Sequence, residues 1–512
     1  MTPAQRRQLA TLVAFAAVMA APVPWAVPAL LGVAAAVSMA RVARYVVTRS
    51  RARATTEESG AMVLGSDHRG RPVVVTEPEL AAHGLIVGAS GAGKTTSLLR
   101  ILTEQIRRGR PVIAIDLKGS PAFVAQLRAA AQAAGRPLRV WTPDGPERWN
   151  PLAHGNATEL KDKLIATERF TEPHYQRAAE RYLLNVLQVA QAIQPHRPPV
   201  LAEIVQLMDA YRLRAGLRDV PRALGVRVQD YLAALTPDQF SAVRGLQTRL
   251  AILTESHTGP FLLGDHSGPA GATDGRRAID VRQALSGHEV VVFSLNSSKY
   301  GHLASQLGTL VVQDLICAAG QRLSEGAAGP ALARATVAID EFSGVGAENV
   351  VALFARGRES GFAVLLATQE MADLDRAARG LRDQVLGNTA LKLAHRQDVP
   401  ASAQLIAQII GTEKRWEETE QVGGSPLGSW GGVRRTRREA EQFIVHPNQI
   451  KTLQTGDAVL ISKLRPDRTG TIRVAPPAGG GPPNRGARPA RGAPPNRGAS
   501  PAGHPRDGRE LG

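Results

Sequence analysis

The sequence predicts an α/β protein with a mainly parallel sheet, and three observations support this prediction. A short apolar run at 84–87 passes through a glycine-rich loop into the helical pattern SLLRILTEQI. Three more continuous apolar runs, at 111–116, 335–340 and 362–368, are typical of strands buried on both faces. With 43% hydrophobic and 21% charged residues, the 512-residue chain is globular, which excludes wholesale disorder and a polytopic transporter.

The N-terminal segment 1–54 predicts a membrane anchor. It holds seven arginines and no acidic residue, with 33 uncharged residues between Arg7 and Arg41. One helix of that length would rise about 50 Å, against a hydrocarbon core of roughly 30 Å. Because three prolines cluster in the middle of the run, we expect two short transmembrane helices whose flanking arginines place both ends in the cytoplasm. A single Pro-kinked helix and a cleaved signal peptide are the alternatives.

The C-terminal segment 476–512 predicts a disordered Pro/Gly/Arg-rich tail. It repeats PPNRGA and offers almost no apolar side chain large enough to bury. The tail is either simply solvated or an arginine-rich contact to DNA phosphates or a protein partner. Most of the net charge of +17 lies in the two ends of the chain, so bulk charge supports nucleic-acid binding only weakly. The single cysteine, Cys317, excludes a disulfide framework and a multi-cysteine zinc site.

The glycine-rich loop has the phosphate-binding pattern G-x-x-x-x-G-K-[ST]. Glycines let backbone N–H groups turn toward phosphates, and the following helix aims its N-terminus at the same anion. We therefore expect ATP to bind here, with Lys94 supplying a charge to the phosphates and Thr95 a hydroxyl to Mg²⁺. A glycine turn with an accidental lysine is the alternative. The predicted nucleotide-binding residues are Gly88, Ala89, Ser90, Gly91, Ala92, Gly93, Lys94, Thr95 and Thr96.

A second apolar run, ATVAIDEF, ends in two adjacent acids, Asp340 and Glu341. An extended chain points neighbouring side chains to opposite sides, which lets Asp340 hold Mg²⁺ while Glu341 polarises the attacking water. We interpret them as a Walker B pair; a plain solvent-facing strand end is the alternative. Asp116, which ends the run PVIAID without a second acid, is assigned to the neighbouring strand's loop.

Two further candidates lie in RGRESGFAVLLATQEMADL, at 356–374. Gln369 ends a buried strand, where ligands of open parallel sheets gather, so we expect it beside the γ-phosphate or its water. A strand-end hydrogen bond to backbone is the alternative. Arg356 and Arg358 could both be solvated, but a positive charge delivered across a subunit boundary completes many such sites. We prefer Arg358 for that role.

Together these residues resemble the TraG/TraD class of type IV secretion coupling proteins, which belong with FtsK and HerA among the RecA-like motor ATPases. The resemblance covers most of residues 60–475, and it rests on the shared order of many motifs. These are HGLIVGASGAGKTTS, the D-x-K-G loop of Asp116, Lys118 and Gly119, WNPL at 149–152, FSLNSSKYGHLASQLGTLVVQDL at 293–315, AIDEF, LLATQEMADL, NTALKLAHRQD, IIGTEK and IVHPNQIKTLQTGDAVLI. The chain departs from the pattern at Ser120, where an acidic residue often follows D-x-K-G.

The resemblance implies a RecA-like P-loop ATPase that assembles as a homo-hexamer around DNA on the cytoplasmic side of a bacterial cell membrane. It implies ATP and Mg²⁺ as cofactors, and DNA, a relaxase or relaxosome and type IV secretion channel components as partners. It also implies that Arg358 acts on a neighbour's ATP, and that an all-helical domain is inserted in the core. The expected domains are an anchor at 1–54, a nucleotide-binding domain at 55–150 and 261–475, a helical domain at 151–260 and a tail at 476–512.

Three functions compete on the sequence alone. The first is an ATPase that moves DNA, or a relaxase–DNA complex, toward a secretion channel. The second is an FtsK- or HerA-like translocase of double-stranded DNA without a channel, and the third is a non-hydrolysing ATP-binding scaffold. Intact acids and Gln369 argue against the scaffold. Aromatic residues make up only 4% of the chain, so a stacking platform for single strands is poorly supplied.

Overall fold

The computed structural model describes residues 61–168, 170–264, 277–326, 334–342, 345–421 and 434–477. The predicted anchor at 1–54 lies outside the described residues, as does all of the predicted tail beyond Pro477. The described residues belong to one compact unit, which ends at Gly479.

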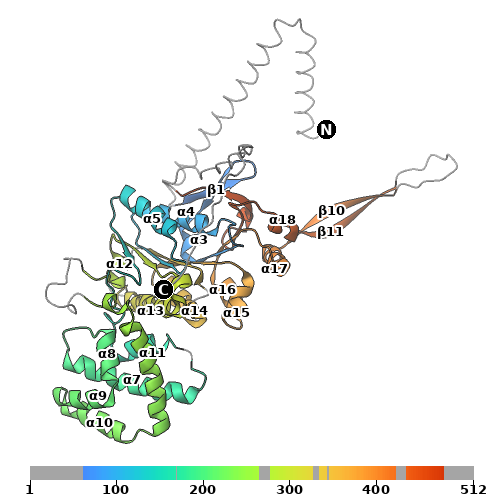
Figure 1. Cartoon of the computed structure of the whole chain (residues 1–512). Helices are drawn as coiled ribbons and strands as arrows, with labels where there is room; N and C mark the ends of the chain where they lie inside the picture. Colours follow the sequence, from blue (N-terminus) through green and yellow to red (C-terminus); the bar gives the residue numbers. More distant parts are fainter. Residues whose placement is uncertain are drawn as a thin grey trace, which may run out of the picture. The chain divides into compact units, whose positions relative to one another are not determined.

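An eleven-stranded mixed sheet forms the centre of this unit (Figure 1). In sheet order its strands are β2 (Pro72–Val75), β1 (Met62–Asp67), β13 (Gly470–Val474), β12 (Asp457–Ser462), β9 (Leu391–Ala394), β3 (Gly84–Val87), β8 (Phe362–Thr368), β7 (Ala335–Asp340), β4 (Val112–Asp116), β6 (Val290–Ser294) and β5 (Leu138–Trp141). Neighbours from β9 to β5 are parallel, whereas β2, β1, β13, β12 and β9 pair antiparallel. The predicted α/β class and its mainly parallel sheet are confirmed, and the four predicted strands are β3, β4, β7 and β8.

Alternate residues of each central strand pack into separate cores on the two faces of the sheet. In β4, Val112 and Ala114 join one core, while Ile113 and Ile115 join the other. The first core is covered by α3 (Glu77–Ala81), α4 (Lys94–Arg107) and α5 (Pro121–Ala133). The second is covered by α12 (Val281–Ser286), α13 (Ser297–Gly326), α14 (Ala347–Glu359), α15 (Met371–Ala377) and α16 (Leu381–Asn388). Helices on both faces explain why these strands are apolar throughout.

Between β5 and β6 the described residues form helices and connecting turns but no strand of the sheet. The elements are α6 (Ala157–Ile165), α7 (Pro173–Ile193), α8 (Leu201–Leu207), α9 (Ala210–Gly216), η1 (Leu217–Asp219), α10 (Arg222–Ala233), α11 (Pro237–Glu255), η2 (Gly259–Phe261) and α12. The helices α10 and α11 are separate because Thr236 caps α11, with Pro237 in its first turn. Because the apolar core runs without a break from these helices into the sheet, the boundaries at 150 and 260 stay predictions.

The helix α13 joins the sheet to these helices through a buried polar cluster. Asp314 accepts hydrogen bonds from the Trp149 indole at 3.1 Å and from the Lys163 ammonium at 2.8 Å. Lys163 and Asp314 are both buried, so their ion pair offsets the cost of burying each charge. In the described part of the chain, α13 is the one helix long and apolar enough to cross a membrane, but most of it is buried in this core.

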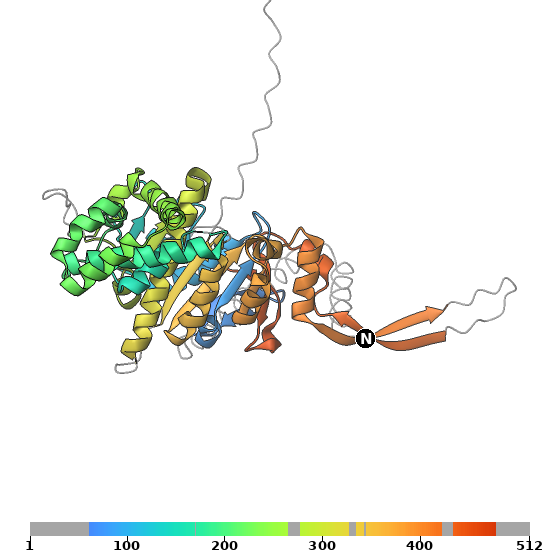
Figure 2. The same ribbon diagram turned by 90° about the horizontal axis from the view of Figure 1, so that it is seen from below.

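A two-stranded ribbon forms a separate sheet. Its strands are β10 (Thr412–Gln421) and β11 (Arg434–Phe443). They follow α17 (Pro400–Ile410) and precede α18 (Pro447–Lys451). The short helix η4 (Pro466–Arg468) lies between β12 and β13 of the main sheet. The strands pair antiparallel from Thr412–Phe443 outward, and both views show the ribbon extending away from α17 and α18 (Figures 1 and 2). Trp416 is 67% exposed on it. The ribbon strands pair only with each other and are not part of the eleven-stranded sheet that carries the candidate site.

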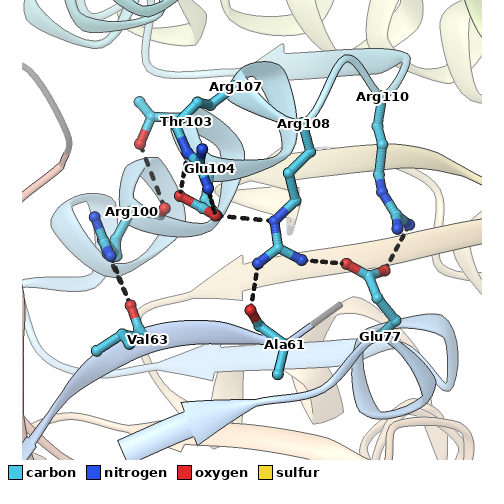
Figure 3. A network of polar contacts seen from close by, with 9 residues as sticks. All are labelled: Ala61, Val63, Glu77, Arg100, Thr103, Glu104, Arg107, Arg108 and Arg110. Atoms are coloured by element: carbon cyan, nitrogen blue, oxygen red, sulfur yellow. Dashed lines mark hydrogen bonds and ion pairs between the residues drawn. The ribbon is translucent and has the colours of Figure 1, made fainter. Parts of the chain in front are cut away.

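The carboxyl end of α4 is tied to the chain that leads in from the N-terminus (Figure 3). Arg108 donates to Glu77 at 2.8 Å and to Glu104 at 2.9 Å, and Arg100 donates to the Val63 carbonyl at 2.7 Å. Glu77 and Glu104 are largely buried, so these arginines compensate their charge. The network fixes the far end of the helix that begins at the glycine-rich loop.

Candidate nucleotide-binding site

The glycine-rich loop lies at the carboxyl end of β3 and is held by segments distant in sequence. The Ala89 N–H donates to the Arg396 carbonyl at 2.8 Å, and the Gly456 N–H donates to the Ala92 carbonyl at 3.1 Å. A Cβ on Gly88 would lie 2.5 Å from the Cβ of His395, so only glycine fits at this position. The segments after β9 and before β12 thus set the shape of the loop.

Lys94 begins α4 and folds back over the loop. Its ammonium donates to the Gly88 carbonyl at 2.5 Å and the Ala89 carbonyl at 3.1 Å. Burial, and then the nearby charge of Lys118, lower the pKa of Lys94. The exposure of the predicted nucleotide-binding residues varies: Gly88, Ala89, Ala92 and Lys94 are buried, Gly93, Thr95 and Thr96 are half-buried, and Ser90 and Gly91 are exposed.

The two acids at the end of β7 meet this loop. The Thr95 hydroxyl lies 3.4 Å from Oδ2 of Asp340, across 245 positions of sequence. Glu341 has a φ of +62°, in the left-handed region, so the chain is not extended there. The expectation that the two carboxylates point to opposite sides is therefore wrong. Both pair with Lys118, whose ammonium lies 3.6 Å from Asp340 Oδ1 and 3.0 Å from Glu341 Oε2.

Gln369 lies just beyond β8 and reaches the same cluster. Its amide donates to Oε1 of Glu341 at 3.0 Å. Arg358 does not join the cluster of its own chain: it is exposed near the end of α14, close to His83, which precedes β3. The carboxyl end of β3 carries the glycine-rich loop, so Arg358 lies at the opposite edge of the sheet.

Two residues of the site had no assigned role in the sequence analysis. Lys118 was noted only as part of the D-x-K-G pattern. Its position two residues after a strand-end acid could have indicated that it lies in the site. His395 lies in NTALKLAHRQD without any local signal. Its Nδ1 donates to the Asp457 carbonyl at 2.9 Å, so its Nε2 accepts from the Ser97 hydroxyl at 2.9 Å. Burial lowers the pKa of His395 to about 4, so the ring is neutral at pH 7.

The residues present fit a magnesium nucleotide. Asp340 is buried, its Oδ1 has no hydrogen bond, and burial raises its pKa. Hydroxyl and carboxylate oxygens, here from Thr95 and Asp340, are the ligands that Mg²⁺ prefers. Among the described residues, no group of three or more His, Cys, Asp or Glu side chains could hold a metal on its own. A cation bound through one or two protein oxygens together with substrate phosphates matches that donor set.

Comparison with known families matches two parts of the chain. Residues 334–455 match a family described as the TraM recognition site of TraD and TraG. Residues 45–111, which include the glycine-rich loop, match the FtsK/SpoIIIE family. No curated protein sequence matches the chain.

Solved structures share the fold over most of the chain at low sequence identity. The plasmid coupling protein TrwB in complex with ADP and Mg²⁺ has a TM-score of 0.58 and 14% identity, and the match covers 82% of this chain and 90% of TrwB. TrwB with a non-hydrolysable ATP analogue gives a TM-score of 0.57 at 14% identity, covering 82% and 91%. VirB4 of Thermoanaerobacter pseudethanolicus gives 0.52 at 14% identity, covering 81% and 96%.

The glycine-rich loop lies in the segment that matches the FtsK/SpoIIIE family, and the fold is similar to that of the TrwB structures. The strands β7, β8 and β9, with the two acids and Gln369, lie in the segment that matches the TraM recognition site of TraD and TraG, so the chain is similar to the TraG/TraD coupling proteins over this part.

Proposed function

We propose that the protein is a membrane-anchored ATPase that couples ATP hydrolysis to the transfer of DNA, or of a relaxase–DNA complex, through a type IV secretion apparatus. The observation that carries the proposal is the meeting of Thr95 with Asp340 at 3.4 Å. A loop built to bind phosphates and a buried strand-end acid thereby share one site. The matches to TraD/TraG and to FtsK/SpoIIIE support DNA as the cargo.

Each residue of the site has a proposed role in ATP hydrolysis. The loop N–H groups and Lys94 bind the phosphates, and Thr95 and Asp340 hold Mg²⁺, which neutralises charge on the phosphate oxygens. Glu341 accepts a proton from the attacking water, and the Gln369 amide orients Glu341 through the hydrogen bond at 3.0 Å.

The direct test is ATP turnover by the full-length protein with and without DNA. We expect DNA to stimulate turnover and high salt to remove the stimulation, because no base-reading motif is present and contacts to phosphates are screened. In donor cells, deletion of the gene should abolish plasmid transfer. Nucleotide binding without hydrolysis under all of these conditions would instead indicate a non-hydrolysing ATP-binding scaffold.

A DNA translocase not tied to secretion is the second candidate, and the FtsK/SpoIIIE match at 45–111 favours it. Both candidates predict DNA-stimulated turnover, so the plasmid-transfer assay separates them. Normal transfer from cells that lack the gene would favour the translocase.

We also propose that the protein forms a hexameric ring at the cytoplasmic face of the membrane, with a relaxosome and channel components as partners. The TraM recognition match at 334–455 supports a relaxosome partner. Arg358 is exposed and lies away from the glycine-rich loop of its own chain, which supports a role at the site of a neighbour.

Mixing two inactive variants tests this role of Arg358. We expect Lys94→Ala and Arg358→Ala proteins to be inactive alone and to regain activity when co-assembled. In an equal mixture about a quarter of the interfaces combine an intact site with an intact arginine. Arg356→Ala is the control from the same exposed helix end and should retain turnover. Co-assembly without any recovery would show that Arg358 does not act in trans.

A further inference from the structure

The loop after β4, with the sequence DLKGS at 116–120, presents a lysine to the acids of the neighbouring strand. The Lys118 ammonium pairs with Glu341 at 3.0 Å and with Asp340 at 3.6 Å. The Lys118 side chain is 34% exposed, whereas that of Asp340 is 2% exposed. The lysine therefore approaches a buried carboxylate from the solvent side.

The backbone of this loop is fixed by its own hydrogen bonds. The Asp116 carboxylate accepts from the Lys118 N–H at 3.0 Å and from the Ser120 N–H at 2.6 Å. Gly119 has a φ of +66°, and a Cβ there would lie 2.4 Å from the Cβ of Asn296. Ser120 replaces the expected acid and caps α5 instead, because its hydroxyl accepts from the Phe123 N–H. The loop thus positions a long, flexible lysine side chain on a rigid base.

Without Lys118, the carboxylates around it would form a cluster of negative charge with no nearby cation paired to it. Asp116 and Asp340 are direct partners in the β4–β7 register, and Glu341 follows Asp340. Three carboxylates therefore gather at the ends of two adjacent strands. Burial raises the pKa of Asp340, and the charge of Lys118 is the largest opposing influence. Lys94 lies nearby, but its ammonium donates to loop carbonyls rather than to these acids.

We propose that Lys118 is a positioning residue: its ammonium is the resident counter-charge of Asp340 and Glu341, and it competes with a divalent cation for them. Two cations a few ångströms apart repel strongly at a largely buried site, so the approach of Mg²⁺ requires the lysine to withdraw. The half-buried, four-carbon side chain can withdraw into solvent while the loop stays in place. The inference rests on the proposed function only through the assignment of Asp340 as the metal-holding acid.

Thermal unfolding of the nucleotide-free, full-length protein tests this inference. The variants are Lys118→Met, which removes the charge, and Lys118→Arg, which keeps it, with Lys118→Gln as a second neutral variant in case the first does not fold. Lys414→Met is the matched control, because Lys414 also pairs with a carboxylate at 3.6 Å but on the exposed ribbon. Unfolding is followed with MgCl₂ and with NaCl at equal ionic strength, so that the probe is the metal alone.

Without Mg²⁺, we expect Lys118→Met to lower Tm by about 2–4 °C and Lys118→Arg to leave it near the wild-type value. MgCl₂ should restore the Tm of Lys118→Met while shifting the wild type and the control little. In a second measurement, the Mg²⁺ concentration that half-saturates binding of a fluorescent ATP analogue should fall at least about fivefold in Lys118→Met. Equal responses of Lys118→Met and wild type to MgCl₂ would overturn the inference, as would Lys118→Arg behaving like Lys118→Met. Failure of the wild type to bind nucleotide would instead count against the proposed function.

Discussion

Lys94→Ala is expected to abolish DNA-stimulated ATP turnover and, in donor cells, plasmid transfer. The ammonium is the one charge that the glycine-rich loop itself presents, and it is buried with only backbone carbonyls as hydrogen-bond partners. Removing a donor aimed at developing charge in a buried site costs roughly 10²–10³ in rate. Nucleotide affinity should fall as well, because the same charge attracts the phosphates before reaction. The measurements are turnover by the purified protein and mating frequency.

The control for Lys94→Ala is a substitution of another lysine that donates hydrogen bonds to backbone carbonyls. Lys463 donates to the carbonyls of Leu386 at 2.8 Å and Gly387 at 3.0 Å, outside the nucleotide site. Lys463→Ala should therefore show how much stability is lost when such a lysine is removed, without loss of ATP turnover. If Lys94→Ala turned over ATP normally while remaining folded, the loop would not be the hydrolytic site and the transport proposal would fail with it.

The parts of the site that the sequence predicts are those that local rules govern. The glycine spacing predicts the loop, since its conformation depends on residues within eight positions. Asp340 could be placed beside it because carboxyl ends of parallel strands meet at one edge of the sheet. The two cores on the sheet faces follow from the same rule: strands covered on both sides are apolar throughout.

The remaining features depend on conformations or partners that sequence periodicity does not carry. The left-handed φ of Glu341 turns its carboxylate toward Lys118, and no local pattern predicts that conformation for a glutamate. His395 directly follows β9 and contacts Gly88 across more than 300 positions of sequence, so only the folded sheet brings the two together. The antiparallel strands β12, β13, β1 and β2 were not predicted, because no motif in them links them to the loop or its acids.

Glu341→Gln is expected to lose ATP turnover while retaining nucleotide binding, which separates it from Lys94→Ala. The carboxylate is held on both oxygens, by the Gln369 amide at 3.0 Å and by Lys118 at 3.0 Å. An amide of the same shape cannot accept a proton from water, and loss of a general base costs roughly 10²–10⁴ in rate. The phosphates are bound by the loop and Lys94, so the Kd for ATP should change little. Equilibrium binding and turnover measured on one preparation check both parts.

The distinct signature of Glu341→Gln is a protein that accumulates with ATP bound. Since hydrolysis fails after binding, DNA should no longer change the amount of phosphate that the variant releases. Copies of the variant should also inhibit wild-type protein when both are present in the same transfer machinery. Glu439→Gln, which alters a glutamate paired with Lys414 on the exposed ribbon, is the control and should leave turnover unchanged. Substantial turnover by Glu341→Gln would mean that another group takes the proton, and burial raises the pKa of nearby Glu370, which makes it the next candidate.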